Sequence, residues 1–453
     1  MYERRKVLEH FEAQKDFLQT TVPSNIEKYR QGDTTVTVTD RDGRPISGAV
    51  IDVKQLSHEF RFGANLFMLD ELETEEKNET YKKRFAELFN MATLPFYWDT
   101  LEPERGKPRY GKDSPRIYRR PTPDLCIEFC QKHGIEPREH ALAYDQFFPN
   151  WLSGASTDEV KAALENRFAE IAARYADKIP TIEVTNEMTW REGKTAFYDD
   201  PDYIEWCFRT ARKHFPNNQL VINEGTTMIW GERSRCRPTD QYYSYIESNL
   251  LKGAPIDAIG MQYHLFLHKG KTEYEETRES LDPMRMYRTM DLYAKLGKPL
   301  QITEITLPAY SWKPEDEEIQ AEMLETIYSV WFSHPAVEQI VYWNLVDGYA
   351  HLWDPSPEAI AASQGDMTLG ENRYFGGLLR FDLSEKPAYR KLRELLLERW
   401  HTEATLVTDE HGRATFRGFY GDYSLSVQSE DQKTHVVYTL SKRNTKKDVR
   451  IEV

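Results

Sequence analysis

The sequence predicts an α/β protein in which a (β/α)8 TIM barrel carries an accessory β-sandwich module built from both chain ends. Eight short apolar runs alternate with longer amphipathic segments between residues 60 and 400. Strands that alternate with helices pair in parallel, and eight such units fit a closed barrel better than an open doubly wound sheet. No glycine-rich phosphate or dinucleotide fingerprint follows any of these runs. Both chain ends alternate apolar and polar residues with the period of a strand.

The first part of the chain is predicted to hold a helix and then a hairpin. Residues 1–32 have the pattern of a polar amphipathic helix followed by a linker. Residues 33–59 alternate around the turn DRDGRP, in which Gly43 suits a positive φ angle, so we expect a β-hairpin. Residues 401–453 repeat the pattern around the turns DEHGR and YGDY. Because isolated hairpins are marginally stable, we expect 33–59 and 401–453 to form one sandwich beside a barrel of residues 60–400.

Each predicted barrel strand is a short apolar run with candidate functional residues at its carboxyl end. The runs are FRFGANLF from Phe60, FNMATLPFYW from Phe89, IEPREHALAY from Ile135, TIEVTNE from Thr181, QLVINEG from Gln219, IDAIGMQYH from Ile256, PLQITEI from Pro299 and EQIVYWNLVD from Glu338. In a barrel of this kind the carboxyl ends of the strands carry the active site. The chemistry is therefore expected at Trp98, Asp145, Asn186, Glu187, His264, Glu304 and Asp347.

Two of these runs end on a glutamate, at Glu187 and at Glu304. Parallel strands deliver their carboxyl ends to a common rim, so the two carboxyl groups should face one site. Cleaving a glycosidic bond needs one carboxyl group that donates a proton to the leaving oxygen and a second, ionised one that attacks the anomeric carbon. We therefore predict a two-carboxylate sugar-cleaving site in which Glu187 starts protonated and Glu304 stays ionised.

The composition favours a neutral carbohydrate partner. A formal net charge of -15 and a pI near 5.4 argue against nucleic acid and against an anionic membrane. Aromatic residues make up 13% of the chain, and flat rings stack well on sugar faces. Four cysteines give no zinc or disulfide framework, so neither a metal nor another cofactor is expected.

The start of the chain, MYERRKVLEHFEAQKDF, is charged throughout and lacks the apolar stretch of a secretory signal. No run of about 18 apolar residues occurs elsewhere. The expectation is a cytoplasmic protein, or a secreted or periplasmic one from which a signal was removed. The sequence leaves the oligomeric state open.

The order of the strand-end pieces resembles the retaining glycoside hydrolase family 10 endo-xylanases over most of residues 60–400. The matching pieces are FN with WDTLEPERG, HALAY with FFPNW, EVTNE, VINE, IDAIGMQYHL, ITEI, VYWNLVD and GLLRFDLSEKPAY. The resemblance implies that Glu187 is the general acid and base and Glu304 the nucleophile. It also implies that Asn186 binds the sugar 2-OH, and it places Gln262, His264 and His140 in the pocket.

The chain departs from the family pattern only where substrate is recognised. LPFYW, from Leu94 to Trp98, stands where the family has ENxMKW, whose polar residues grip sugars on the glycone side. Asp145 replaces a sugar-contacting histidine, and Thr306 replaces the aspartate that would orient His264. The family's strand-eight tryptophan aligns with His351, with Trp353 two residues further on. These changes predict a working glycosidase whose sugar is not ordinary xylan.

Every predicted substrate-binding residue has a structural alternative. The predicted set is Asn186, His264, Gln262, Trp343, His140, Trp98, Asp145, Tyr144 and His351. The aromatic residues could pack in the core, the histidines could be satisfied there, and Asp145 and His351 could form rim ion pairs. Glu224 could equally bind substrate or form a structural salt bridge.

Two other functions remain open from the sequence. The first is a non-catalytic carbohydrate-binding protein that uses the barrel cleft. The second is a metal-assisted hydrolase, which a missing cluster of histidine and aspartate ligands at the strand ends disfavours. Endo or exo action also stays open, and the insertion from Trp353 to Tyr374 could close one end of the cleft.

Overall fold

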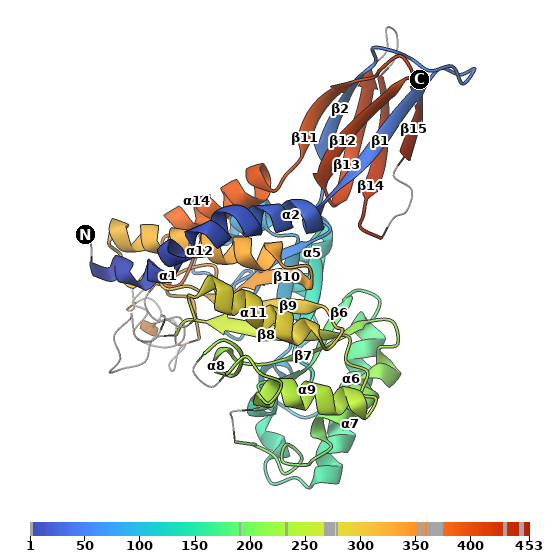
Figure 1. The fold of residues 1–453 in the computed structure, drawn as a ribbon. Coiled ribbons are helices and arrows are strands. Elements are labelled where there is room, and N and C mark those ends of the chain that lie inside the picture. The colour runs from blue at the N-terminus through green and yellow to red at the C-terminus, as the bar shows by residue number, and fades with distance from the viewer. Residues whose placement is uncertain are drawn as a thin grey trace.

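The computed structural model describes residues 3–189, 192–231, 234–266, 277, 280–351, 356, 358–359, 362, 375–428, 433–443 and 448–453. Figure 1 shows a barrel surrounded by helices and, at one end, a separate stack of strands that both chain ends supply. The N-terminus lies beside the barrel, and the C-terminus lies at the far end of the strand stack.

The barrel contains all eight predicted strands, and it is closed. Its strands are β3 (Arg61–Asn65), β4 (Met91–Pro95), β5 (Glu136–His140), β6 (Thr181–Asn186), β7 (Gln219–Asn223), β8 (Ala258–His264), β9 (Leu300–Thr306) and β10 (Val337–Tyr342). Neighbouring strands pair in parallel in chain order, and β10 pairs with both β9 and β3. The predicted (β/α)8 barrel is confirmed.

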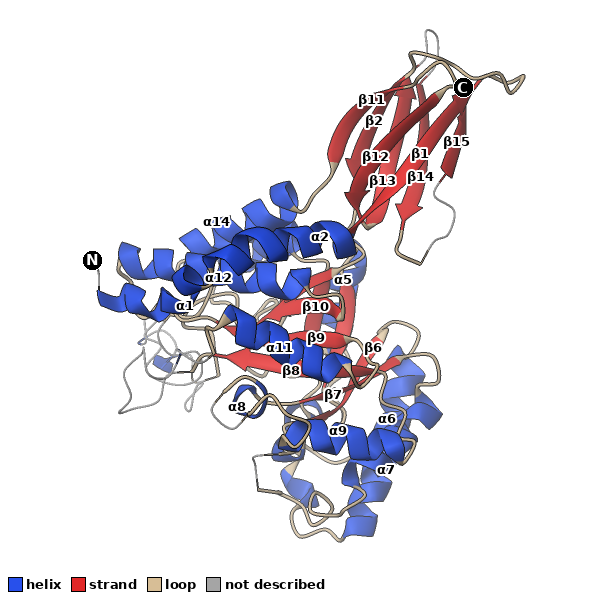
Figure 2. Cartoon of the chain, viewed as in Figure 1, coloured by secondary structure: helices blue, strands red, loops and turns tan. Residues whose placement is uncertain are grey.

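Helices cover the outside of the barrel (Figure 2). They are α3 (Glu75–Leu88), α4 (Trp98–Leu101), α5 (Pro123–His133), α6 (Thr157–Tyr175), α7 (Tyr203–His214), α8 (Thr226–Ile229), α9 (Gln241–Leu251), α11 (Pro283–Ala294), α12 (Pro314–Ser333) and α14 (Pro387–Glu394). Short turns η3 (Asp145–Phe147), η4 (Asn150–Leu152) and η5 (Leu395–Arg399) lie between them. Because helices cover the strands outside and side chains fill the lumen, β6 and β9 are buried at every position. None of the described helices has the length and the apolar composition needed to cross a membrane.

The strand stack is a sandwich of two sheets. One sheet holds β12 (Arg413–Phe419), β1 (Gln31–Thr39) and β15 (Asp448–Glu452). The other holds β11 (Glu403–Val407), β2 (Val50–Gln55), β13 (Gly421–Gln428) and β14 (Lys433–Leu440). Inward-facing residues of both sheets, such as Val36, Ile51, Phe416 and Leu425, form one hydrophobic cluster. The chain ends therefore meet in one module, as the alternation predicted.

The expected hairpin of residues 33–59 is present only next to its turn, where Thr39 and Pro45 form an antiparallel bridge. Gly43 has φ of 80°, as the turn requires. However, β1 pairs with β12 and β15, while β2 pairs with β11 and β13 in the opposite sheet. Both strands bury one apolar face, and a sandwich buries these faces against each other, whereas a two-stranded hairpin would leave them in water.

Residues 3–30 form helices that pack along the barrel rather than a free linker. They comprise η1 (Glu3–Leu8), α1 (Glu9–Ala13), η2 (Phe17–Thr21) and α2 (Val22–Arg30). Figure 1 shows α2 lying along α12. Val22 and Ile26 are buried in the barrel's outer core. Arg30 donates hydrogen bonds to the carbonyl oxygens of Phe332 and His334 at the end of α12.

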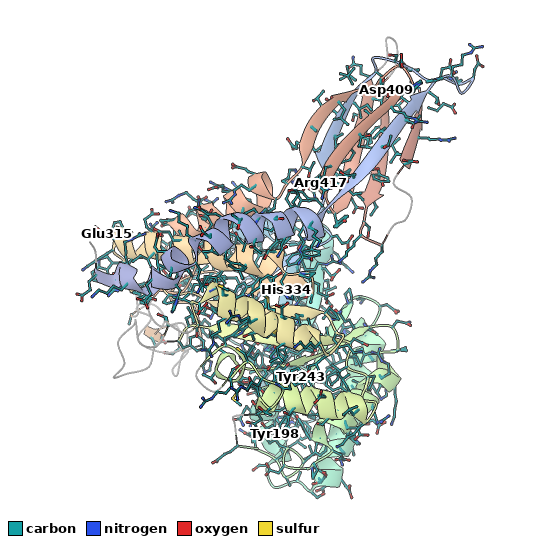
Figure 3. The ribbon with its side chains drawn as sticks, in the orientation of Figure 1. Tyr198, Tyr243, Glu315, His334, Asp409 and Arg417 are labelled. Carbon is teal, nitrogen blue, oxygen red and sulfur yellow. The ribbon has the colours of Figure 1, made fainter. Side chains whose placement is uncertain are left out.

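An arginine joins the N-terminal helices to the sandwich. Arg417, on β12, donates to Asp33 on β1 at 2.8 Å and to the carbonyl oxygen of Glu27 on α2 at 2.8 Å. Figure 3 labels Arg417 at the point where the sandwich approaches α2. The sandwich is therefore attached to the barrel through α2 as well as through the chain itself.

Candidate active site

Glu187 follows the last residue of β6 and lies in a buried setting. Its φ angle of 54° is uncommon for a residue with a side chain and occurs where a site requires it. Tyr144 donates its hydroxyl hydrogen to Glu187 Oε2 at 2.5 Å, and Gln262 Nε2 donates to Oε1 at 3.2 Å. Tyr198, on the loop after β6 (Figure 3), donates to the carbonyl oxygen of Glu187 at 3.1 Å. These bonds fix both the side chain and the backbone.

Glu304 lies on β9 and is also buried. Asn223 Nδ2 donates to its Oε1 at 3.0 Å, and His264 Nε2 lies 3.2 Å from its Oε2. The register pairs Gln262 with Glu304 across β8 and β9, and Gln262 Nε2 also donates to Asn186 Oδ1 at 3.1 Å. The structure therefore brings together Asn186, Glu187, Gln262, His264 and Glu304.

A buried ionic network lies next to Glu304, and the sequence did not reveal it. Glu183, on β6, forms a salt bridge with Arg138, and both side chains are 0% exposed. His140 Nδ1 lies 2.8 Å from Glu183 Oε1, and Asn223 Nδ2 donates to the same oxygen at 3.3 Å. Asn223 thus contacts both Glu183 and Glu304. Glu183 ends no strand, so the strand-end rule could not select it.

The pKa of Glu304 is raised to about 8, and burial is the largest cause; the charges of His140 and Arg138 act to lower this pKa, while those of Glu183 and Glu187 act to raise it. Burial also acts on Glu183, but His140 and Arg138 overcome it and lower the pKa of that carboxyl. This differs from the expectation that Glu304 stays ionised. The physical reason is that burial disfavours the ionised form of Glu304 and that the carboxyl groups of Glu183 and Glu187 lie nearby.

The raised pKa of Glu304 predicts a stability that depends on pH. Between its ordinary value of 4.5 and about 8, the unfolded chain loses this proton while the folded protein keeps it. Protonation therefore stabilises the fold fully below pH 4.5, and the contribution is lost as the pH rises through 8. Glu304→Gln cannot ionise, so its Tm should exceed that of the wild type by roughly 5 °C more at pH 9 than at pH 4.

Thermal unfolding across this pH range tests the prediction. Glu410→Gln, at an exposed turn of the sandwich, is the control and should give a Tm difference that does not change with pH. A constant Tm difference for Glu304→Gln would contradict the raised pKa.

One side of the site is lined by a cluster of rings, which we call the aromatic wall: Phe67, Tyr97, Tyr144, Phe147 and Trp343. The ring centres of Phe67 and Trp343 are 5.0 Å apart, and those of Tyr97 and Phe147 are 4.5 Å apart. The wall reaches the buried ionic network because the Tyr97 hydroxyl oxygen lies 3.0 Å from His140 Nε2. Trp343 also lies against the rings of His140 and His264.

Not every predicted site residue lies beside Glu187, Glu304 or the aromatic wall. Trp98 is buried against Phe148 and Trp151, and its Nε1 donates to Glu102 at 2.8 Å. The preceding residue, Tyr97, is the one in the wall. Tyr97 precedes a helical turn, and the direction of that turn decides which ring faces the site.

Asp145 and His351 are not among the residues that surround Glu187 and Glu304. Asp145 is buried and accepts hydrogen bonds from Lys194 N and from Thr195 Oγ1, so it holds the loop after β6. His351 is exposed on the loop after β10. Trp353, two residues after His351, lies outside the described residues, as does most of the insertion 353–374.

Three other strand-end side chains have structural partners. Thr306 Oγ1 lies 2.9 Å from His264 Nδ1 and can orient that ring where the family pattern has an aspartate. Glu224 is buried and accepts hydrogen bonds from the backbone N–H groups of Thr189 and Gly225. Asp347 forms a buried salt bridge with Lys386 at 2.6 Å.

His140, Glu183 and Glu304 could together hold a metal ion, since their ligand atoms lie within 4.8 Å of one another. The sequence missed this cluster because its members come from three strands. Their bonding fits a metal poorly: the two ring nitrogens of His140 already contact Glu183 and Tyr97, and the Arg138 guanidinium contacts Glu183. A second positive charge beside Arg138 would be repelled.

Relatives of known sequence cover most of this chain. Endo-1,4-beta-xylanase 2 of Arabidopsis thaliana is 25% identical over 421 residues, which are 91% of this chain and 34% of the plant protein. Anti-sigma-I factor RsgI6 of Acetivibrio thermocellus is 24% identical over 406 residues, 89% of this chain and 45% of that protein. The chain thus spans less than half the length of these two relatives.

The fold and a family model give the same classification. The crystal structure of native xylanase 10B from Thermotoga maritima superposes with a TM-score of 0.57 at 22% identity, over 75% of this chain and 96% of the xylanase. This likeness shows the shared barrel. The model of glycosyl hydrolase family 10 matches residues 54–392, which include every barrel strand and both rim glutamates. The chain therefore belongs to glycosyl hydrolase family 10.

Proposed function

We propose that the protein is a retaining glycoside hydrolase that cleaves β-glycosidic bonds of a polysaccharide or oligosaccharide. The observation that carries the proposal is the placement of Glu187 and Glu304 at one end of the barrel, each held by side-chain donors. The two charges are close enough for Glu187 to raise the pKa of Glu304. Membership of family 10 and the xylanase relatives support the same reaction class.

In the first step Glu304 attacks the anomeric carbon while Glu187 gives its proton to the leaving oxygen. The glycosidic C1–O bond breaks, and an ester forms between the sugar and Glu304. Asn223 donates to Glu304, as His264 does in the tautomer with its hydrogen on Nε2, so both favour the ionised form that attacks. In the proposed reaction Glu187 carries the proton that it gives to the leaving oxygen.

In the second step Glu187 takes a proton from water, and the resulting hydroxide breaks the ester. Tyr144 and Gln262 donate to Glu187 and stabilise the ionised form that this step needs. Two displacements at the same carbon return the sugar with its original β configuration.

We further propose that the sugar differs from ordinary xylan. Where the family pattern has polar residues on the glycone side, this chain has Leu94 to Trp98, and Tyr97 from that segment packs in the aromatic wall. Rings that pack on one another cannot replace the hydrogen bonds that such polar residues would make to sugar hydroxyls.

The sandwich of residues 33–59 and 401–453 is proposed to have a structural role. Of the N-terminal segment of residues 1–32, residues 3–30 pack on the outer helices of the barrel of residues 60–400, whereas Gln31 and Gly32 already pair within β1 of the sandwich. None of the aromatic residues in the described sandwich strands is exposed, so the outer faces of the sheets offer no ring for a sugar to stack on.

A substrate screen followed by NMR of the product tests the proposal. The protein is incubated with xylan, β-mannan, β-1,3- and β-1,4-glucans and 4-nitrophenyl β-glycosides, and the first product anomer is recorded. We expect the β-anomer and the same rate after dialysis against EDTA. Net inversion would contradict the double displacement, and loss of activity with EDTA would favour a metal at His140, Glu183 and Glu304. Tight glycan binding without any new reducing end would favour a non-catalytic role.

A further inference from the structure

The proposed hydrolase is closed on its glycone side. We propose that residues 116–120, which we call the strap, block that end of the cleft, so that the enzyme removes single sugar units from the non-reducing end of a β-linked chain. This inference rests on the proposed function and adds its mode of action.

The positions of the two glutamates indicate which end of the cleft is the glycone end. Glu187 protonates the leaving oxygen, so the leaving part of the chain lies on the side of β6. The closed order β10-β3-β4-β5-β6-β7-β8-β9 places β10 directly across the barrel from β6. Sugars on the non-reducing side of the cleaved bond must therefore extend toward the carboxyl ends of β10, β3 and β4.

The strap spans this region and contacts the segments that follow all three strands. Arg116 Nε donates to Glu71 Oε2 at 2.7 Å, in the segment after β3. Tyr118 donates its hydroxyl hydrogen to the carbonyl oxygen of Ala350 at 3.2 Å, in the segment after β10. The strap therefore bridges the loops that would form the two banks of an open groove.

The next two strap residues continue the bridge. Arg119, in a left-handed conformation with φ of 57°, donates to Asn344 Oδ1 at 2.6 Å, and Asn65 at the end of β3 donates to the same oxygen at 3.3 Å. The Arg120 guanidinium lies 3.9 Å above the ring of Tyr97, just after β4. A cation over an aromatic face is a favourable contact, and it fixes the strap on the wall.

A single buried arginine holds both ends of the strap. Arg109 Nε donates to the carbonyl oxygen of Pro115 at 2.7 Å, and its Nη2 donates to that of Arg120 at 3.4 Å. Its Nη1 donates to the carbonyl oxygen of Thr100 on α4 at 2.9 Å. The strap is therefore a fixed part of the barrel mouth.

The side chains under the strap are inaccessible. Phe67 is 1% exposed, Trp343 is 2% and Asn344 is 3%, and Arg119 within the strap is itself only 3% exposed. A second glycone sugar would have to displace these packed groups, at the cost of broken hydrogen bonds and lost ring contacts. A glycone chain that continues past a single sugar at Glu304 would therefore meet these groups.

Products from a labelled oligosaccharide distinguish the two modes. Oligosaccharides of three to six units, made from a polysaccharide that the screen identifies, carry 2-aminobenzamide at the reducing end. We expect the free monosaccharide and a labelled product exactly one unit shorter at every early time point. Labelled products of intermediate length at the earliest time would overturn the strap proposal while leaving the hydrolase assignment intact. No hydrolysis of any substrate would overturn both.

Chromogenic substrates measure how strongly the strap disfavours a second glycone sugar. We expect kcat/KM for a 4-nitrophenyl β-monosaccharide to be roughly tenfold or more above that for the matching β-disaccharide, because the second ring meets the strap. A ratio in favour of the disaccharide would count against closure.

Loosening the strap should shift this ratio. The double variant Tyr118→Phe/Arg119→Ala removes two of its contacts across the mouth, and Arg109→Gln weakens its anchor. Each should move the preference toward the disaccharide by several-fold. Arg209→Ala, which removes an exposed arginine from α7, is the matched control and should leave the ratio unchanged. An unchanged ratio in both folded strap variants would contradict the proposal.

Discussion

Glu304→Gln is expected to lower kcat by about 10⁶-fold, because an amide cannot form the glycosyl ester. The variant should still fold, since glutamine occupies the same volume and Asn223 can still donate to its side-chain oxygen. In Glu304→Ala, azide should enter the vacated space and attack the anomeric carbon from the same face. Recovery of turnover as the α-glycosyl azide would then identify Glu304 as the nucleophile.

Glu187→Gln should lose activity in a different way. Its first step should remain fast with 2,4-dinitrophenyl glycosides, whose leaving group needs no proton, and the ester should then accumulate because no base activates water. A burst of dinitrophenol followed by slow turnover is the measurement. Glu224→Gln is the matched control, since that buried carboxyl ends the next strand and accepts only backbone hydrogen bonds among the contacts described. Near-wild-type rates in both Glu304→Gln and Glu187→Gln would end this assignment.

Arg138→Met is expected to lower the free energy of unfolding by about 3–5 kcal/mol, the largest stability effect that we foresee. Arg138 and Glu183 are both completely buried, so removing the guanidinium leaves a carboxylate whose charge only His140 then opposes closely. Urea unfolding measures the loss. Because Glu183 also reaches Asn223, the variant should lose activity as well as stability.

A second variant and a control separate this effect from a simple loss of packing. The double variant Arg138→Met/Glu183→Leu removes both charges and should regain part of the stability. Arg174→Met breaks a partly exposed pair with Asp124 and should cost no more than about 1 kcal/mol. A small loss for Arg138→Met, equal to that of Arg174→Met, would show that the network near Glu304 does not depend on this charge pair.

The barrel and the position of its two glutamates could be predicted from the sequence. Each strand is a short apolar run, and the polar residue that ends it must lie at the carboxyl rim once the strands are parallel. The same reasoning placed Asn186 and His264 at this rim, and the resemblance to family 10 added Gln262. These residues depend only on local burial and on chain order, which are the two properties that a sequence pattern records directly.

The tertiary structure alone decided the features that join distant segments. Glu183 lies within a strand, and only the barrel sets it beside Arg138 and Asn223. Tyr97 and Trp98 differ by one position, yet the turn after β4 directs only the first into the wall. The alternation of apolar and polar residues predicts which face of each sandwich strand is buried. It does not predict which strands pair, because pairing depends on which apolar faces meet in the folded module.

The strap is the clearest example of a feature that only the tertiary structure decides. Residues 116–120 show no periodic pattern, so nothing in the sequence predicts that they cross the mouth of the barrel. Their bonds to Glu71, Asn344 and Ala350 span more than 40 positions of the chain in each case. The sequence by itself determined which residues could do chemistry, because that depends on residue type and strand position. How much sugar the site admits depends on long-range contacts, which only the folded chain makes.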